Sequence, residues 1–218
     1  MQILRIAQVV VLAAGIQSAA RPPAADVAAA LQKKYDSIRD FTADFVQETQ
    51  GGLLRKKQVE RGVVQVKKPG KMRWDYRSPE PKVFVSDGQR IYLYVPADNQ
   101  VTVSPVPADD QATTAVLFLV GKGNLTRDFT VSYADAAPPD TYALTLQPKV
   151  QETDYDSLQI VVDRKTLQIR SLTAADREGG RSSFQFTNFK ENAGLADKTF
   201  AFKIPRGADV TTNGSSSR

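Results

Sequence analysis

The stretch that decides the fold runs from Gly62 to Pro96 and reads GVVQVKKPGKMRWDYRSPEPKVFVSDGQRIYLYVP. Hydrophobic and polar residues alternate along it, and each alternating run ends at a turn signal such as Pro-Gly or Asp-Gly. From Met72 to Tyr76 the large apolar side chains fall on one face and the charged side chains on the other. A period of two is typical of a β-sheet with one buried and one solvated face. The stretch therefore predicts short antiparallel strands joined by tight hairpins.

The same alternation recurs on both sides of this stretch. Strands are expected over residues 41–49, 58–68, 72–76, 83–86, 91–95, 100–104, 129–133, 141–147, 158–163, 167–174 and 181–188. Residues 199–204 are expected to add a short closing piece, and 211–218 to form a disordered tail. About ten short strands with short connections are too many for a flat sheet, so we expect strong curling or a barrel. Either parity of residues 91–95 is compatible with an inward orientation.

Two other segments have a helical pattern. After Asp26, a suitable N-cap residue, four apolar residues recur at spacings of four, four and three: Val27, Leu31, Tyr35 and Ile38. This spacing predicts a helix that lies on the sheet. The continuous apolar run 112–120, ATTAVLFLV, has acidic residues before it and glycine after it, which favours a helix, with a buried strand as the alternative. Residues 124–128 are expected to form a second short helical turn.

Residues 1–20 have the layout of a secretory signal peptide. Arg5 precedes an apolar run from Ile6 to Ile16, and Ser18-Ala19-Ala20 is a small-x-small cleavage site. The run is too short to span a bilayer, and an ordinary N-terminal helix is the alternative interpretation. We therefore expect residues 1–20 to be removed, and residues 21–210 to act as a single domain outside the cytoplasm.

The residue types disfavour most catalytic and metal chemistry. The chain contains neither histidine nor cysteine, so it lacks the commonest general base, the commonest metal ligand, a thiol nucleophile and any disulfide. Asp154-x-Asp156 lacks the glycine and glutamate of a calcium loop. The net charge of +5 arises from dispersed cations interleaved with acidic residues, which does not favour a nucleic-acid partner. The sequence therefore predicts no catalytic residue, no metal site and no nucleic-acid partner.

The large apolar residues have two interpretations. They either pack against one another as an ordinary core, or line the concave face of a curved sheet that is capped by the mid-chain helix and leaves room for an apolar ligand. The residues concerned are Met72, Trp74, Tyr76, Phe84, Ile91, Leu93, Leu117, Phe118, Leu119, Leu158, Ile160 and Val162. The pattern alone leaves both interpretations open.

Seven short motifs stand in order along the chain: Phe41-x-Ala43-x-Phe45-x-Gln47, Val66-Lys67-Lys68-Pro69, Met72-x-Trp74, Val85-Ser86-Asp87-Gly88, Ile91-Tyr92-x-Tyr94-x-Pro96, Leu146-x-Pro148-Lys149 and Arg181-Ser182-Ser183-Phe184. Together they resemble the periplasmic outer-membrane lipoprotein carrier family (LolA), over nearly the whole mature chain. The resemblance implies a mainly β fold with helices, an incomplete and strongly curved antiparallel β-barrel. An α-helical lid would close this barrel around an apolar cavity that takes up the acyl chains of a lipoprotein.

The resemblance also implies partners and a site. A carrier of this family receives acylated lipoproteins from an inner-membrane ATP-driven lipoprotein-releasing complex and delivers them to an outer-membrane lipoprotein receptor, as a monomer and without a cofactor. The implied lipid-binding cavity residues are Met72, Trp74, Tyr76, Phe84, Leu93, Leu117, Phe118, Leu158 and Ile160. Two alternatives are a lipid-sensing or lipoprotein-sensing module of the same fold in envelope stress signalling, and a carrier of another envelope lipid.

One position departs from the pattern of the family. The family commonly has arginine before the proline of a Lys-Arg-Pro turn, where its side chain is implied to reach the backbone of the lid, and here the residue is Lys68. Lysine lacks the planar five-donor fork of arginine. We therefore expect Lys68 to form a weaker or differently built lid latch, assisted by Arg61 or Arg73. An ordinary surface lysine is the alternative.

Overall fold

The computed structural model describes residues 21–51, 57–106, 123–152 and 155–213. Its elements, in chain order, are α1 (Ala24–Ser37), β1 (Asp40–Gln50), β2 (Lys57–Lys67), β3 (Lys71–Ser78), β4 (Lys82–Asp87), β5 (Arg90–Val95), η1 (Pro96–Asp98), β6 (Gln100–Pro105), α3 (Leu125–Asp128), β7 (Phe129–Tyr133), β8 (Thr141–Pro148), β9 (Ser157–Asp163), β10 (Ile169–Ala175), β11 (Arg181–Glu191), η2 (Asp197–Phe200) and β12 (Asp209–Thr212). Each predicted strand that falls within the described residues is present. The helices of the described residues are all too short or too polar to cross a membrane.

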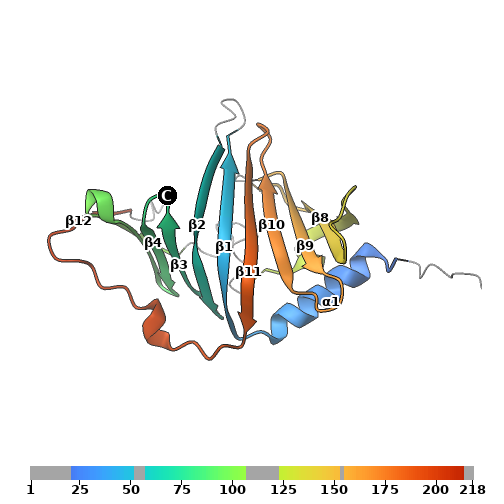
Figure 1. The fold of residues 1–218 in the computed structure, drawn as a ribbon, viewed down its shortest axis with the longest axis horizontal. Coiled ribbons are helices and arrows are strands. Elements are labelled where there is room, and N and C mark those ends of the chain that lie inside the picture. Colours follow the sequence, from blue (N-terminus) through green and yellow to red (C-terminus); the bar gives the residue numbers. More distant parts are fainter. Residues whose placement is uncertain (1–20, 52–56, 107–122, 153–154, 214–218) are drawn as a thin grey trace, which may run out of the picture.

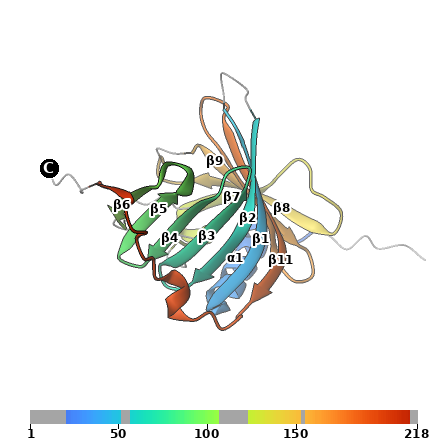
Figure 2. The same cartoon turned by 60° about the vertical axis from the view of Figure 1, so that its left-hand side comes forward.

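The strands form one 12-stranded sheet in the order β12-β6-β5-β4-β3-β2-β1-β11-β10-β9-β8-β7. The chain builds one half outward from β1 to β6 and the other half inward from β7 to β11, and the β1–β11 pair joins the halves (Figure 1). Neighbouring strands are antiparallel, except that β12 pairs with β6 in parallel. The sheet curves strongly but does not close, because β12 and β7 remain at its two ends (Figure 2). The predicted incomplete, curved barrel is therefore confirmed.

The strand register assigns alternate residues to the concave face. Trp74 lies opposite Val64 on one side and Phe84 on the other, and Phe84 lies opposite Leu93. Side chains in directly paired positions point to the same face of a sheet. The odd-numbered residues of β5 therefore face inward, which settles the parity that the sequence pattern left open.

Helix α1 packs against α3 and the edge strand β7. The four residues predicted to form its apolar face are all buried: Val27, Leu31, Tyr35 and Ile38. The helix begins at Ala24 with Pro23 at its N-cap, so the expectation that Asp26 is the N-cap was wrong. Asp26 lies in the first turn, where a carboxylate is still favourable beside the helix N-terminus. The predicted helical turn over residues 124–128 is confirmed as α3, and the Asn124 side chain caps its N-terminus.

After β11 the chain crosses to the outer face of the β3–β6 half (Figure 1). Phe200 is 1% exposed, and the Phe202 ring centroid lies 5.3 Å from that of Tyr92. Residues 201–204 form no strand, so the predicted closing piece is instead β12, which fills the free edge of β6. Thr211 and Thr212 therefore belong to the sheet rather than to the predicted tail. The predicted signal peptide and residues 214–218 lie outside the described residues.

Candidate functional site

Every described residue of the predicted cavity lies on the concave face. The two long rows that the register forms are Val64–Trp74–Phe84–Leu93 across β2 to β5, and Phe184–Leu172–Ile160–Leu144 across β11 to β8. Met72 and Tyr76 flank Trp74 with the same parity on β3, and Leu158 lies opposite Leu146 in the row next to Ile160. Leu117 and Phe118 lie outside the described residues.

The two halves of this face differ in how well they are covered. Leu158 and Ile160 are 2% and 1% exposed and belong to the same hydrophobic cluster as α1. Tyr76 and Phe84 are only partly buried, and Leu93 is 36% exposed. Leu93 is thus the most exposed of the described residues of the predicted cavity. Among the described residues of the predicted cavity, the more accessible ones therefore lie on β3 to β5.

An aromatic cluster crosses the seam between the two halves. The Phe45 ring centroid lies 5.0 Å from those of Trp74 and Tyr76, both in edge-to-face contact, and Trp74 lies 5.2 Å from Phe184. Gly62 makes this packing possible, since a Cβ there would lie 2.9 Å from Phe45 Cε1 and 2.1 Å from the Asp75 carbonyl oxygen. Contacts of this kind prefer offset or edge-on geometry. Rings from β1, β3 and β11 therefore form a common wall.

The predicted site omitted Phe45 and Phe184. Both residues alternate with polar neighbours in the sequence. This alternation is enough to assign each of them to the apolar face of its own strand. Their proximity depends on the β1–β11 pair, which places Phe184 opposite Gln47 and Phe186 opposite Phe45. Periodicity assigns a residue to a face of its own strand, but it does not say which distant strand lies beside it.

The site predicted from the sequence also omitted a polar cluster on the same face. Lys82 Nζ lies 2.6 Å from Glu60 Oε1 and 4.3 Å from the centroid of the Tyr76 ring. The Tyr76 hydroxyl donates a hydrogen bond of 2.9 Å to Gln47 Oε1. Burial, with a further contribution from the Glu60 carboxylate, raises the pKa of Tyr76. Tyr76 therefore remains a protonated hydrogen-bond donor at neutral pH.

Lys68 contacts α1 directly. Its ammonium group donates a hydrogen bond to the Tyr35 carbonyl oxygen and lies 3.7 Å from the centroid of the Tyr35 ring. Burial lowers the pKa of Lys68 to about 8, and the nearby Asp36 carboxylate partly offsets this effect. Arg73 does not assist this contact, because its guanidinium binds Asp75, with Nε 2.8 Å from Oδ2. Arg61 is exposed on β2.

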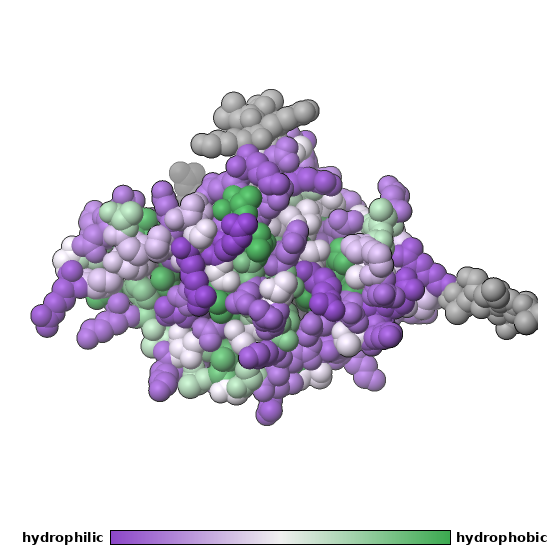
Figure 3. Space-filling model, viewed as in Figure 1, coloured by the Kyte–Doolittle hydropathy of each residue, from purple (hydrophilic) through white to green (hydrophobic). Residues whose placement is uncertain are grey.

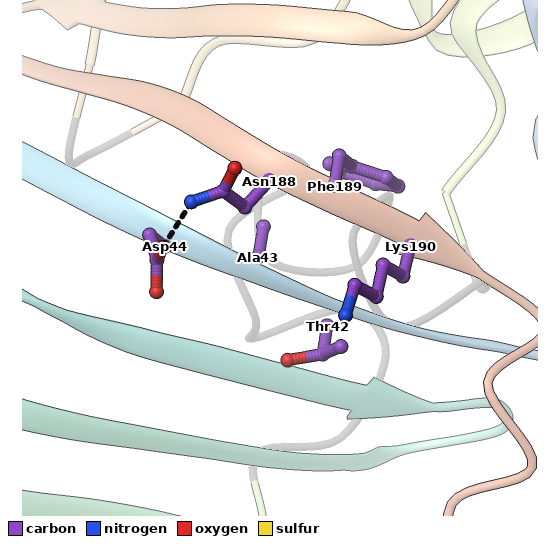
Figure 4. Close-up of a pocket in the computed structure, with 6 residues that line it drawn as sticks. All are labelled: Thr42, Ala43, Asp44, Asn188, Phe189 and Lys190. Atoms are coloured by element: carbon purple, nitrogen blue, oxygen red, sulfur yellow. Dashed lines mark hydrogen bonds between the residues drawn. The ribbon is translucent and has the colours of Figure 1, made fainter.

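The pocket drawn in Figure 4 has a different character. It has a volume of about 420 Å³ and lies at a bulge between β1 and β11, where the register shifts between Thr42 and Asp44. Asn188, at a φ of 51°, donates a hydrogen bond of 2.7 Å from Nδ2 to Asp44 Oδ2. Four of its six lining residues are polar, and much of the surface in Figure 3 is also polar. The described ranges contain no trio of acidic side chains able to hold a metal ion.

The chain is similar to known proteins over most of its length. The family model described as outer membrane lipoprotein carrier protein LolA matches residues 36–203. An outer-membrane lipoprotein carrier protein of Chromohalobacter salexigens is 32% identical over 179 residues, covering 82% of this chain and 83% of that protein. A protein of the same name from Pseudomonas fluorescens is 30% identical over 210 residues, covering 96% and 99%.

The solved structure of an uncharacterized conserved protein from Thermus thermophilus has a TM-score of 0.55 at 12% identity, covering 85% of this chain and 99% of that one. This likeness concerns the fold alone. The family match includes Lys68 and strands β1 to β11, which carry the concave face. The chain therefore belongs to the outer membrane lipoprotein carrier protein (LolA) family.

Proposed function

We propose that this protein is a periplasmic carrier whose concave face binds the acyl chains of lipoproteins released from the inner membrane. The observation that carries the proposal is the apolar row Trp74–Phe84–Leu93, which faces inward and becomes more accessible toward Leu93. Membership of the LolA family supports the same function. The donor would be an inner-membrane ATP-driven lipoprotein-releasing complex, and the acceptor an outer-membrane lipoprotein receptor.

The energetics explain why such a carrier is required. Burial of each CH₂ is worth about 0.8 kcal/mol, so exposing one chain of about sixteen carbons to water costs roughly 13 kcal/mol. An acylated protein therefore does not cross an aqueous compartment unaided. A curved sheet with aromatic and aliphatic side chains on its inner side offers the required apolar surface. Met72, which is unbranched and lies beside Trp74 on this face, suits chains of varied shape.

For the carrier to release its cargo, binding must be opposed by the free-energy cost of a conformational change, which we propose is the displacement of α1 from the sheet. Helix α1 is held to the sheet by the contact from Lys68 to Tyr35, and we propose that this contact is the lid latch. A ligand shifts such an equilibrium only by its different affinities for the two states. Cargo that fits only when α1 is displaced has to supply the free energy of that displacement. Its affinity is therefore lower than the buried apolar area alone would give, and the lower affinity favours hand-off to the receptor.

Mass spectrometry of the protein purified from the periplasm tests the proposal. We expect acylated polypeptides to be recovered with the wild-type chain. Leu93→Glu, which places a charge on the accessible inner face, should reduce recovery at least tenfold. The matched control is Gln185→Glu, which adds the same charge at an exposed position of β11.

Each alternative predicts a different result. Recovery of a non-protein envelope lipid would indicate a carrier of another lipid. Recovery of acylated polypeptides that are never transferred to receptor-bearing vesicles would indicate a sensing module. A folded sample that contains no acylated molecule would contradict both carrier proposals.

A further inference from the structure

A polar cluster interrupts the apolar concave face toward the end of β1 that lies away from α1. It consists of Gln47, Glu60, Tyr76 and Lys82. Gln47 lies opposite Glu60 and Tyr76 lies opposite Lys82. All four have the parity of the inward-facing residues on their strands, as the ring contact between Phe45 and Tyr76 also indicates. The cluster therefore belongs to the same surface as the aromatic wall.

The four side chains form a connected chain of contacts. The Glu60–Lys82 ion pair, at 2.6 Å, lies beside the Tyr76 ring, and the Tyr76 hydroxyl binds Gln47. Gln47 Nε2 also lies 3.4 Å from Ser182 Oγ on β11. The side chain of Glu60 is only 9% exposed, whereas that of Lys82 is 30% exposed. Glu60 is therefore nearly buried, whereas part of the Lys82 side chain is accessible.

Stability alone does not explain this cluster. Burying a carboxylate carries a large desolvation cost, and apolar side chains of similar volume often stabilise a fold as well as a buried ion pair does. The inward-facing neighbours of Glu60 along β2 are Gly62, Val64 and Val66, so an apolar residue would continue the existing pattern. A charged pair in this place has a clearer physical role if it meets polar groups of a ligand.

The concave face has an ordered gradient of polarity along β1. Nearest α1 lie Phe41 and Ala43, both 2% exposed. The ring of Phe45 follows, in contact with Trp74 and Tyr76, and Gln47 comes next. A ligand that matches this gradient is an amphiphile with its apolar part toward α1 and its polar part near Glu60 and Lys82. An acylated polypeptide has this layout, because ester and amide groups join its acyl chains to its first residue.

We propose that Gln47, Glu60, Tyr76 and Lys82 hold the ester and amide linkage of an acylated polypeptide, with its acyl chains directed toward α1. The Lys82 ammonium group donates to ester carbonyl oxygens, and the Glu60 carboxylate accepts from the amide N–H. The polypeptide then leaves the carrier at the end of β1 that is remote from α1. This inference rests on the proposed carrier function and adds the orientation and the polar contacts of the cargo.

Binding of two probes to purified protein tests the inference. The first probe is a synthetic triacylated cysteinyl pentapeptide, and the second is a pyrene-labelled hexadecane that has no ester or amide. The double variant Glu60→Gln/Lys82→Met should bind the lipopeptide about tenfold more weakly, as expected for one lost charge-assisted contact, and the alkane with unchanged affinity. The matched control, Glu48→Gln/Lys57→Met, removes an outer-face ion pair of 2.8 Å between β1 and β2 and should change neither affinity.

The possible failures are distinguishable. If the wild-type protein bound neither probe, the carrier function itself would be contradicted. If it bound the lipopeptide and the Glu60→Gln/Lys82→Met variant bound it equally well, the carrier function would stand and the polar contacts would be overturned. An equal loss of both probes in that variant would also overturn them, because it would indicate a purely structural role.

A second measurement uses only the wild-type chain and tests the orientation. A nitroxide on the second residue of the lipopeptide should broaden the amide NMR signals of Glu48 and Gln58, near the polar cluster. It should leave those of Ile38 and Val66, near α1, sharp. The reverse pattern would overturn the proposed orientation even if the variants proved too unstable to assay.

Discussion

Lys68 and Tyr35 are joined twice, because the lysine ammonium group donates to the Tyr35 carbonyl oxygen and also lies 3.7 Å from the centroid of the Tyr35 ring. Tyr35 lies in the last turns of α1 and is 2% exposed. One side chain from the turn after β2 therefore holds both the backbone and the ring of the helix. Lysine satisfies this carbonyl with a single ammonium group, whereas arginine would offer a planar fork of five donors.

Lys68→Leu should loosen α1, because it removes both the hydrogen bond and the cation–π contact. We expect hydrogen exchange of the amides in the last turn of α1 to accelerate, and bound lipopeptide to dissociate faster. Lys68→Arg should restore slow exchange, whereas Lys57→Leu, at an exposed lysine of β2, should have no effect. Unchanged exchange and unchanged cargo hand-off in Lys68→Leu would contradict the latch.

Lys68 also gives a prediction about pH. Burial lowers its pKa from 10.5 to about 8, so the folded state holds this proton less tightly than the unfolded state. The cost of burying the charged Lys68 is therefore fully present below about pH 8 and absent above pH 10.5, so this group makes the folded state more stable as the pH rises between these values. As the pH rises between these values, the free energy of unfolding of the wild type should therefore increase relative to that of Lys68→Met. Denaturant titrations at pH 7.5 and pH 9.5 measure this difference, and parallel behaviour of the two proteins would contradict the burial of Lys68.

Gly62→Ala should destabilise the fold by about 1–3 kcal/mol through overpacking against Phe45 and the Asp75 carbonyl. Gly51→Ala is the matched control, since a Cβ at Gly51 meets no atom within 4 Å. Chemical denaturation of both variants provides the comparison. Equal stabilities would show that the aromatic wall does not depend on the close approach at Gly62.

Much of the sheet follows from the sequence because its strands are amphipathic. Alternation from Met72 to Tyr76 identifies the inner face of β3, and the spacing from Val27 to Ile38 identifies the buried face of α1. These signals are local, so a single strand or helix is enough to reveal them. The family resemblance additionally predicted that the barrel is incomplete and that Lys68 contacts a helix.

The remainder depends on contacts between distant segments. Phe184 joins the wall of Phe45 and Trp74 only through the β1–β11 pair. Glu60 and Lys82 look like ordinary surface charges in the sequence, and only the register places them on the inner face. The pairing of β12 with the free edge of β6 likewise depends on two distant segments, and no local sequence pattern predicts it. Leu117 and Phe118 remain predictions, because they lie outside the described residues.

The segment after β11 should stabilise the outer face of the β3–β6 half. Phe200→Ala removes a side chain that is 1% exposed, and should cost about 3–5 kcal/mol. Phe202→Ala, at a partly buried ring beside Tyr92, should cost clearly less. Thermal and chemical unfolding of both variants tests this order, and a larger cost at Phe202 would contradict the packing described for η2.

The central claim is that acyl chains bind to the concave face. Leu93 and Tyr92 are neighbours on β5 that point to opposite faces, so they form a matched pair for photocrosslinking with p-benzoylphenylalanine in living cells. The account predicts crosslinks to acylated polypeptides from position 93 and none from position 92. Crosslinking from position 92 alone, or with equal efficiency from both positions, would contradict it.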